Sequence, residues 1–161
     1  MKKLFSMILL MLFCSSAYSQ DEISCNTDEF TGVETCKTGS AILSTYKSEA
    51  LIATIEFFFS SKTGEYVVLM SFASDEWQYL TTKKAYFLLD GDRVNYNLIK
   101  THSEPSSGRV IEQYAIQLTR EDVNNFVKAN KVRFKISNDE YEFDEEINTK
   151  LVHLKNRVEK L

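Results

Sequence analysis

The chain is poor in the residues from which catalytic and metal sites are most often built. Its 161 residues include two histidines, three cysteines, one tryptophan, one proline and five glycines. It contains no glycine-rich phosphate loop, H-E-x-x-H pair or G-x-S-x-G elbow. We therefore predict no catalytic residue, cofactor or metal ligand set, and we expect a non-enzymatic protein. No repeat, low-complexity stretch or linker divides the chain, so a single domain is expected.

Positive charge is also in deficit. Lysine and arginine total 19 against 23 aspartate and glutamate residues, which gives a net charge of −4 at pH 7. Contacts to phosphate need clustered lysine and arginine, so an acidic chain is poorly suited to nucleic acid. We expect no nucleic-acid partner and no attraction to anionic membrane surfaces.

The chain has no apolar segment of membrane-spanning length after the N-terminal one. Residues 1–19 have the pattern of a secretory signal peptide: two lysines, an apolar run that ends at Phe13, and small residues that favour cleavage before Gln20. The run is too short to span a bilayer, which takes roughly 20 residues, and a retained anchor is the alternative. The bulky Phe13 before Cys14 argues against lipidation. We expect residues 20–161 to be periplasmic or secreted, without stable membrane insertion.

The strongest folding signal is the segment Ala50–Ala73, in which two apolar runs are separated by Ser60–Gly64. In each run every second residue is apolar, which predicts two strands with one face turned to the core. The core-facing residues are Leu51, Ala53, Ile55, Phe57, Phe59, Tyr66, Val68, Met70 and Phe72. The other face also carries apolar residues. We therefore expect a central hairpin that is covered on both sides for part of its length.

A second hairpin is predicted from Lys84 to Lys100. Asp90-Gly91 at its middle is a strong signal for a type I′ turn, which needs positive φ at both central residues. Closing the chain there pairs Phe87 with Val94 and puts both on one face, which supports this register.

The remaining segments alternate between strand and helix patterns. A short helix is expected after Thr119, and a longer amphipathic helix is expected at the C-terminus. Strands are expected at Ala41–Tyr46, Arg109–Leu118 and Lys131–Ser137, a loop or ragged edge strand at Ser74–Tyr79, and a loop at Thr101–Gly108. The pattern predicts a mainly β (α+β) fold, an antiparallel sandwich or curled sheet of about six to eight strands on which the last helix docks.

Two cysteines, Cys25 and Cys36, remain once the signal peptide is removed. Folding the chain back around Phe30-Thr31 brings the two cysteines opposite each other, so we expect a cross-strand disulfide in an oxidising compartment. Two alternatives stay open. A metal pair would lack two further ligands for structural zinc, and a catalytic thiol pair would lack the C-x-x-C spacing.

The segment between these cysteines contains Asp28-Glu29-Phe30-Thr31-Gly32. It resembles the D-x-F-T-G stretch near the mature N-terminus of small uncharacterised secreted bacterial proteins and lipoproteins. The resemblance implies a β-rich domain that ends in a helix, and it implies no activity. This chain departs from some of those proteins by lacking their lipidation site.

Trp77 and Tyr79 are the candidate binding residues, because they share a parity within a polar stretch. Exposed tryptophan and tyrosine side chains stack on sugar rings or anchor protein partners. The alternative is that these two residues pack in a satellite of the core.

Three further clusters are explained better by structure than by chemistry. His102-Ser103-Glu104 are adjacent in sequence, and neighbouring side chains cannot form a catalytic triad with one another. Asp90 and Asp92 belong to a turn and lack the ligand spacing of a calcium loop. The carboxylates of Asp139–Glu146 suit a helix start and a solvated face, with a cation or basic-partner patch as the alternative.

These patterns predict a binding or interaction domain with an unknown protein or carbohydrate partner. A protein inhibitor of a hydrolase is one concrete form. Two other classes stay open. One is a hydrolase or isomerase whose carboxylates converge only in three dimensions, and the other is an envelope assembly component that pairs through a sheet edge. A monomer is expected, with a dimer through the last helix as the alternative.

Overall fold

The computed structural model describes residues 23–47 and 52–161, and these form twelve strands and two helices. The predicted signal peptide, Cys14 and Leu51 lie outside the described residues. The larger, seven-stranded sheet has the order β1 (Ser24–Thr27), β2 (Glu34–Lys37), β5 (Ile52–Ser60), β6 (Glu65–Ser74), β10 (Arg109–Leu118) and β9 (Ile99–Ser106), with β3 (Ala41–Ile42) beside β5. The five-stranded sheet has the order β4 (Ser44–Lys47), β12 (Asp139–Glu142), β11 (Val132–Ile136), β7 (Lys84–Leu89) and β8 (Asp92–Asn97). The predicted mainly β class is confirmed.

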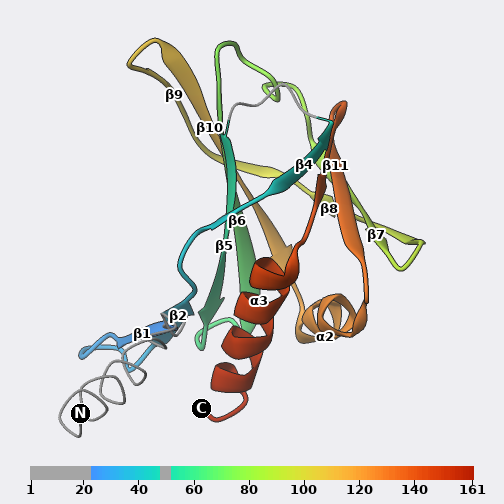
Figure 1. Cartoon of the computed structure of the whole chain (residues 1–161). Helices are drawn as coiled ribbons and strands as arrows, with labels where there is room; N and C mark the ends of the chain where they lie inside the picture. Colours follow the sequence, from blue (N-terminus) through green and yellow to red (C-terminus); the bar gives the residue numbers. More distant parts are fainter. Residues whose placement is uncertain (1–22, 48–51) are drawn as a thin grey trace, which may run out of the picture.

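β5 and β6 form the predicted central hairpin and lie between β2 and β10 in the larger sheet (Figure 1). Their register pairs Phe57 with Val68 and Phe59 with Tyr66. Every predicted core residue of this hairpin that the structure describes is buried, namely Ala53, Ile55, Phe57, Phe59, Tyr66, Val68, Met70 and Phe72. The alternate residues of both strands are mostly half-buried, so the expected cover on the second side is not found over these residues.

At two places a single residue joins a strand of one sheet to a strand of the other. Leu43 separates β3, which pairs with β5, from β4, which pairs with β12. Leu98 separates β8 of the smaller sheet from β9 of the larger one. The prediction of a single strand at Ala41–Tyr46 is therefore wrong, because the chain changes sheets at Leu43.

The predicted loop at Thr101–Gly108 is also wrong, since most of it belongs to β9. Pro105 and its polar neighbours are typical of loops, but β9 is the last strand of its sheet, where a proline is tolerated. Ser107 and Gly108 adopt φ values of 52° and 80° and close a tight turn into β10.

α2 (Arg120–Lys128) and α3 (Glu145–Val158) close one end of the space between the sheets (Figure 1). Thr119 caps α2 and Asp144 caps α3, because each side chain accepts a hydrogen bond from a first-turn N–H group. The side chains that α3 buries in the core are Ile147, Leu151, Leu154 and Val158. The predicted docking of the C-terminal helix is confirmed.

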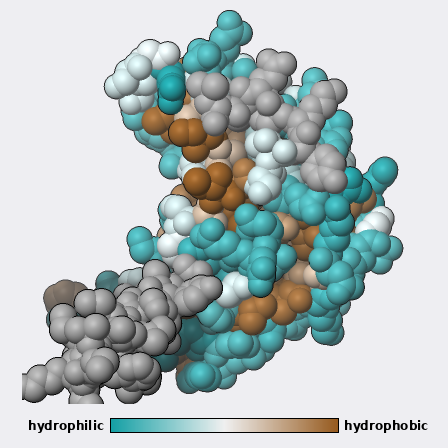
Figure 2. All heavy atoms as spheres, in the orientation of Figure 1, coloured by the Kyte–Doolittle hydropathy of each residue, from teal (hydrophilic) through white to brown (hydrophobic). Residues whose placement is uncertain are grey.

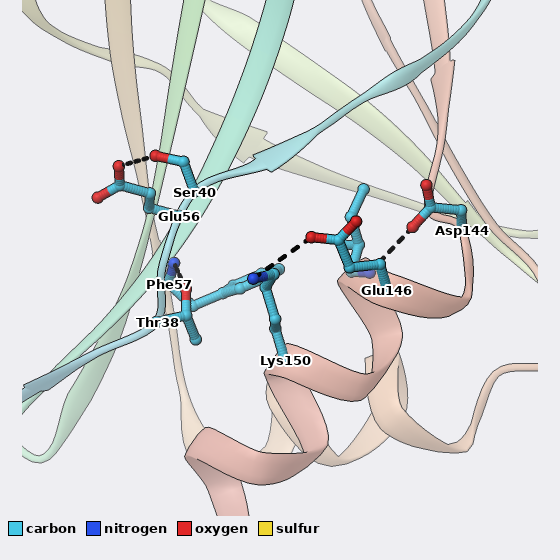
Figure 3. A network of polar contacts seen from close by, with 8 residues as sticks. Thr38, Ser40, Glu56, Phe57, Asp144, Glu146 and Lys150 are labelled. Carbon is cyan, nitrogen blue, oxygen red and sulfur yellow. Dashed lines mark hydrogen bonds and ion pairs between the residues drawn. The ribbon is translucent and has the colours of Figure 1, made fainter. Parts of the chain in front are cut away.

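A buried lysine of α3 faces the stretch that joins β2 to β3 (Figure 3). Lys150 Nζ lies 3.3 Å from Glu146 Oε1 and close to Gly39. In the same stretch the Thr38 hydroxyl accepts a hydrogen bond from the Phe57 N–H at 3.0 Å. Lys150 therefore lies where α3 packs against the stretch between β2 and β3.

The opposite end of the space between the sheets is filled by Tyr79, from the connection between β6 and β7. Its hydroxyl donates a hydrogen bond to Asp139 and lies 2.7 Å from the Tyr141 hydroxyl, and both partners belong to the smaller sheet. Its backbone N–H lies 3.2 Å from the carboxylate of Glu112, which belongs to the larger sheet. Tyr79 therefore connects the two sheets.

Glu112 is fully buried, and its carboxylate is satisfied by three groups. It accepts hydrogen bonds from the N–H groups of Gln78 at 2.8 Å and Tyr79, and from the Tyr114 hydroxyl at 3.1 Å. Burial, reinforced by the neighbouring carboxylates, raises the pKa of Tyr79 and of Tyr114 far above the ordinary phenol range. Both phenols are therefore protonated donors at any physiological pH.

We expect Tyr79→Phe to destabilise the fold by about 1–3 kcal/mol, because it removes a donor from the buried Asp139 carboxylate. The free energy of unfolding in urea measures this loss. Tyr86→Phe is the matched control, since Tyr86 is half exposed on the outer surface and its hydroxyl should contribute almost nothing. Equal stability of the two variants would contradict the role given to Tyr79.

Candidate functional site

Most of the molecular face drawn in Figure 2 is hydrophilic, with hydrophobic residues gathered in a hollow at its left. Among the described residues, the exposed large hydrophobic side chains are Phe30, Ile42, Ile52, Trp77, Leu80, Tyr86, Ile99 and Leu161. Phe30 differs from the others in degree, because it is 99% exposed and the next, Ile42, is 69% exposed. The candidate site is therefore the segment that carries Phe30.

Phe30 lies in the turn of the β1–β2 hairpin, which projects from the body of the molecule (Figure 1). Cys25 and Cys36 are direct partners in this hairpin and form a disulfide, with 4.0 Å between their Cα atoms. The predicted cross-strand disulfide is confirmed. Ligand atoms of Cys25, Glu34 and Cys36 lie within 4.8 Å of one another, but the bonded sulfurs offer no thiolate to a metal ion.

The base of this hairpin is held by the rest of the fold. Cys36 is fully buried, and β2 pairs with β5 so that Cys36 lies opposite Phe59. The N–H of Ser61 donates to the Glu34 carbonyl at 2.9 Å, and the Ser61 hydroxyl accepts from the Glu34 N–H at 2.8 Å. The guanidinium of Arg157 on α3 lies 3.9 Å from the Glu34 carboxylate. These contacts restrain the hairpin where it joins the sheet.

The turn itself is organised by Asp28. Its Oδ1 accepts hydrogen bonds from the Phe30 N–H at 3.0 Å, the Thr31 N–H at 2.7 Å and the Thr31 hydroxyl at 2.9 Å. The Gly32 N–H donates to the Asp28 carbonyl at 2.8 Å, and Gly32 has a φ of 67°, which glycine adopts without strain. The N–H of Asp28 donates to the Val33 carbonyl at 2.9 Å. The turn is therefore fixed without any help from the Phe30 ring.

This geometry explains three of the four defined residues of the D-x-F-T-G segment. Asp28 supplies the acceptor, Thr31 supplies two donors and Gly32 supplies the left-handed backbone. The Phe30 ring is exposed to solvent and stabilises nothing in the turn. A rigid turn that presents an apolar ring lowers the ordering cost of binding, which is the usual advantage of a preorganised contact.

Trp77 and Tyr79 do not form the common surface that the sequence suggested. Trp77 is 42% exposed, and Lys100 Nζ lies 5.8 Å from its ring centroid. Tyr79 is buried against Phe72 and Tyr141, so the expectation of an exposed residue is wrong for Tyr79 and the packing alternative applies. Its hydroxyl finds partners inside the protein, which removes the usual reason for a tyrosine to reach solvent.

The acidic and histidine clusters have structural roles in the described residues. His102 is exposed on β9 and lies 3.3 Å from Glu104, with no triad geometry. Asp90 and Gly91 form the expected turn, with φ values of 51° and 105°. The Asp90 carboxylate also accepts hydrogen bonds from the N–H groups of Asn130 at 3.0 Å and Lys131 at 2.8 Å, which connect this turn to the segment after α2. Five carboxylates of the Asp139–Glu146 run bind Tyr79, cap α3 or pair with lysines.

No family model, curated protein or solved structure matches this chain. In the described part of the chain, neither helix is long and apolar enough to cross a membrane. The candidate site therefore rests on its geometry.

The sequence predicted the turn at Phe30-Thr31 but did not single out Phe30. One feature of the sequence could have indicated Phe30. It is a large apolar residue at the centre of a short turn between two cysteines, and a residue at the tip of a turn does not pack in the core.

The turn should loosen in acid. Hydrogen bonds from Thr31 and Phe30 to the Asp28 carboxylate lower its pKa below the usual 3.8. A lowered pKa in the folded state means that the carboxylate stabilises the turn at neutral pH and stops doing so as the pH falls through that pKa. We expect the Phe30 and Thr31 amide resonances to titrate with a midpoint below 3.8, and not to titrate in Asp28→Ala. A midpoint at or above 3.8 would contradict the assignment.

Loss of the disulfide should cost about 3 kcal/mol, the chain-entropy value for so short a loop. We expect the double variant Cys25→Ala/Cys36→Ala to show this loss in urea unfolding. Dithiothreitol should lower the stability of the unmodified chain by a similar amount and leave the variant unchanged. A variant as stable as the oxidised chain would show that the hairpin is held by its other contacts alone.

Proposed function

We propose that this chain is a secreted or periplasmic, non-enzymatic protein-binding domain that inserts Phe30 into an apolar pocket of its partner. The observation that supports the proposal is an almost fully exposed Phe30 on a turn that five hydrogen bonds organise and a disulfide closes. Burial of a phenylalanine side chain contributes about 1.5–3 kcal/mol, enough to make it the dominant contact of an interface.

Export is part of the same proposal. The disulfide between Cys25 and Cys36 is typical of an oxidising compartment, and the pattern of residues 1–19 is typical of a signal peptide. An inhibitor of a hydrolase is the most concrete version, because a rigid loop with one projecting side chain suits a substrate-binding cleft. The resemblance of the Asp28–Gly32 segment to secreted bacterial proteins is compatible with this role and implies no activity.

The alternatives receive less support from the described residues. A carboxylate-based enzyme would need acids that meet solvent, whereas Glu112 and Asp139, the two buried carboxylates, bond to protein groups. An assembly component would use a free strand edge; β9, one of the end strands of the two sheets, carries Pro105 and charged side chains, which discourage strand addition there. A protein-binding role follows more directly from Phe30.

Phe30→Ala should reduce the affinity for the partner at least about 30-fold, the loss expected for a hot-spot residue of 2 kcal/mol. Its unfolding free energy should stay within about 0.5 kcal/mol of the unmodified value, because the ring is exposed. The measurement is capture from periplasm or culture medium on the immobilised chain, followed by surface plasmon resonance with the captured protein.

Ile99→Ala is the matched control, since Ile99 is also an exposed large hydrophobic residue but lies on β9 of the body. It should capture the same partner with unchanged affinity. For the inhibitor version, the captured protein should be a hydrolase that loses activity when the chain is added, and Phe30→Ala should restore that activity. If Phe30→Ala captures and inhibits as the control does, the proposal is wrong.

A further inference from the structure

A groove on the outer face of the five-stranded sheet is separate from the Phe30 hairpin. Its volume is about 390 Å³, and its outward-facing lining residues are Tyr86, Leu88, Arg93, Arg133, Lys135 and Glu140. A second hollow of about 390 Å³ shares Leu88 and Arg133 with the first and reaches Gly91 in the β7–β8 turn. The combined groove therefore runs along the face of four strands, β12, β11, β7 and β8.

Cations outnumber carboxylates in this groove, although the chain as a whole is acidic. Strand pairing puts Arg93 and Arg133 on either side of Leu88, about 10 Å apart at their Cα atoms. Both carboxylates of the combined groove are already bonded. Lys135 Nζ lies 3.8 Å from Glu140, and Asp90 accepts hydrogen bonds from the N–H groups of Asn130 and Lys131. Arg93 makes no hydrogen bond or ion pair within the part of the chain that the structure describes. Its guanidinium can therefore bind an external anion without breaking an internal contact.

An aromatic ring lies beside these charges. Tyr86 is 49% exposed and is the direct strand partner of Lys135. Leu88 follows Tyr86 on the same outward face of β7 and is half-buried. Together the two side chains give the groove an apolar floor next to its cations. A phenol ring offers a flat surface of fixed orientation, which suits the apolar face of a sugar ring.

We propose that this groove binds an acidic saccharide, whose ring packs on Tyr86 and whose carboxylate or sulfate is bound by Arg93. A guanidinium makes paired hydrogen bonds to either anion, so both sources of charge share one chemistry. Arg133 and Lys135 lie on β11 directly opposite Glu142 and Glu140, so the anion contact is assigned to Arg93. The proposal is independent of the partner of Phe30.

Other polyanions fit this groove less well. An extended peptide binds to a sheet edge through backbone hydrogen bonds, whereas this groove lies across the face of the sheet. Specific nucleic-acid interfaces bury about 1,000 Å² or more of protein surface, whereas a hollow of about 390 Å³ has the size of a small-ligand site. An acidic oligosaccharide meets both the size and the charge of the groove.

The test is isothermal titration of the purified chain with three oligosaccharides of equal length: oligogalacturonate, a heparin-derived oligomer and a neutral maltooligosaccharide. We expect binding of one or both acidic oligomers and none of the neutral one. Binding of oligogalacturonate would show that a carboxylate is sufficient. Binding of the heparin-derived oligomer alone, which carries both carboxylates and sulfates, would show that a sulfate is required. Arg93→Gln and Tyr86→Ala should each weaken binding at least about tenfold, because each removes a direct contact.

Arg109→Gln is the matched control, because Arg109 is an exposed arginine at the start of β10 in the other sheet. It should bind as the unmodified chain does, and so should Phe30→Ala. Circular dichroism confirms that the exposed substitutions leave the fold intact. The proposal is overturned if neither acidic oligomer binds, or if Arg93→Gln and Tyr86→Ala behave like Arg109→Gln. Equal binding of polyglutamate or oligothymidylate, unaffected by Tyr86→Ala, would also overturn it, since the groove would then attract polyanions in general.

Discussion

The alternation of apolar side chains in β5 and β6 is the constraint on which the rest of the structure depends. A slip of one residue in this hairpin would turn Phe57 and Phe59 to solvent and bring the other face of the strand, which includes Glu56 and Ser60, into the core. The register is therefore strongly determined, and it determines where other elements attach. β2 pairs along the end of β5, which brings Cys36 against Phe59 and orients the β1–β2 hairpin. The position of Phe30 thus follows from the register of the central hairpin.

The polar network around Tyr79 is the second feature that determines how the two sheets pack. Two sheets that meet through apolar faces can slide, whereas hydrogen bonds from Tyr79 to Asp139 and Glu112 define one arrangement. A buried carboxylate is costly unless it is fully paired, and Glu112 is paired with two N–H groups and a phenol. The carboxylates of Glu112 and Asp139 are therefore occupied by hydrogen bonds within the protein. Any binding chemistry therefore has to come from the surface, where Phe30 and the groove of the smaller sheet lie.

Local patterns predicted most of the elements, and long-range contacts account for the errors. The Asp90-Gly91 turn and the Thr119 cap depend on a few adjacent residues, so the sequence alone was sufficient for both. The burial of Tyr79 depends on Asp139, sixty residues away, and no local pattern reports that contact. The change of sheets at Leu43 depends in the same way on the distant partner strands β5 and β12. The exposure of Phe30 lies between these cases, because a turn was predicted but its freedom from the core was not.

A single exposed hydrophobic residue is common on protein surfaces and needs no explanation by itself. Phe30 differs because hydrogen bonds of the surrounding residues hold its backbone in one conformation. Ordering a residue costs about 1–2 kcal/mol, which opposes the stabilisation that these hydrogen bonds provide. The order is useful to a partner, which then binds a ring whose entropy has already been reduced. The groove is also preorganised, but by packing instead of by a hydrogen-bonded turn. Its cations and Tyr86 lie on strands that the core already holds rigid. Both surfaces are therefore held in place by the core that the register of β5 and β6 organises.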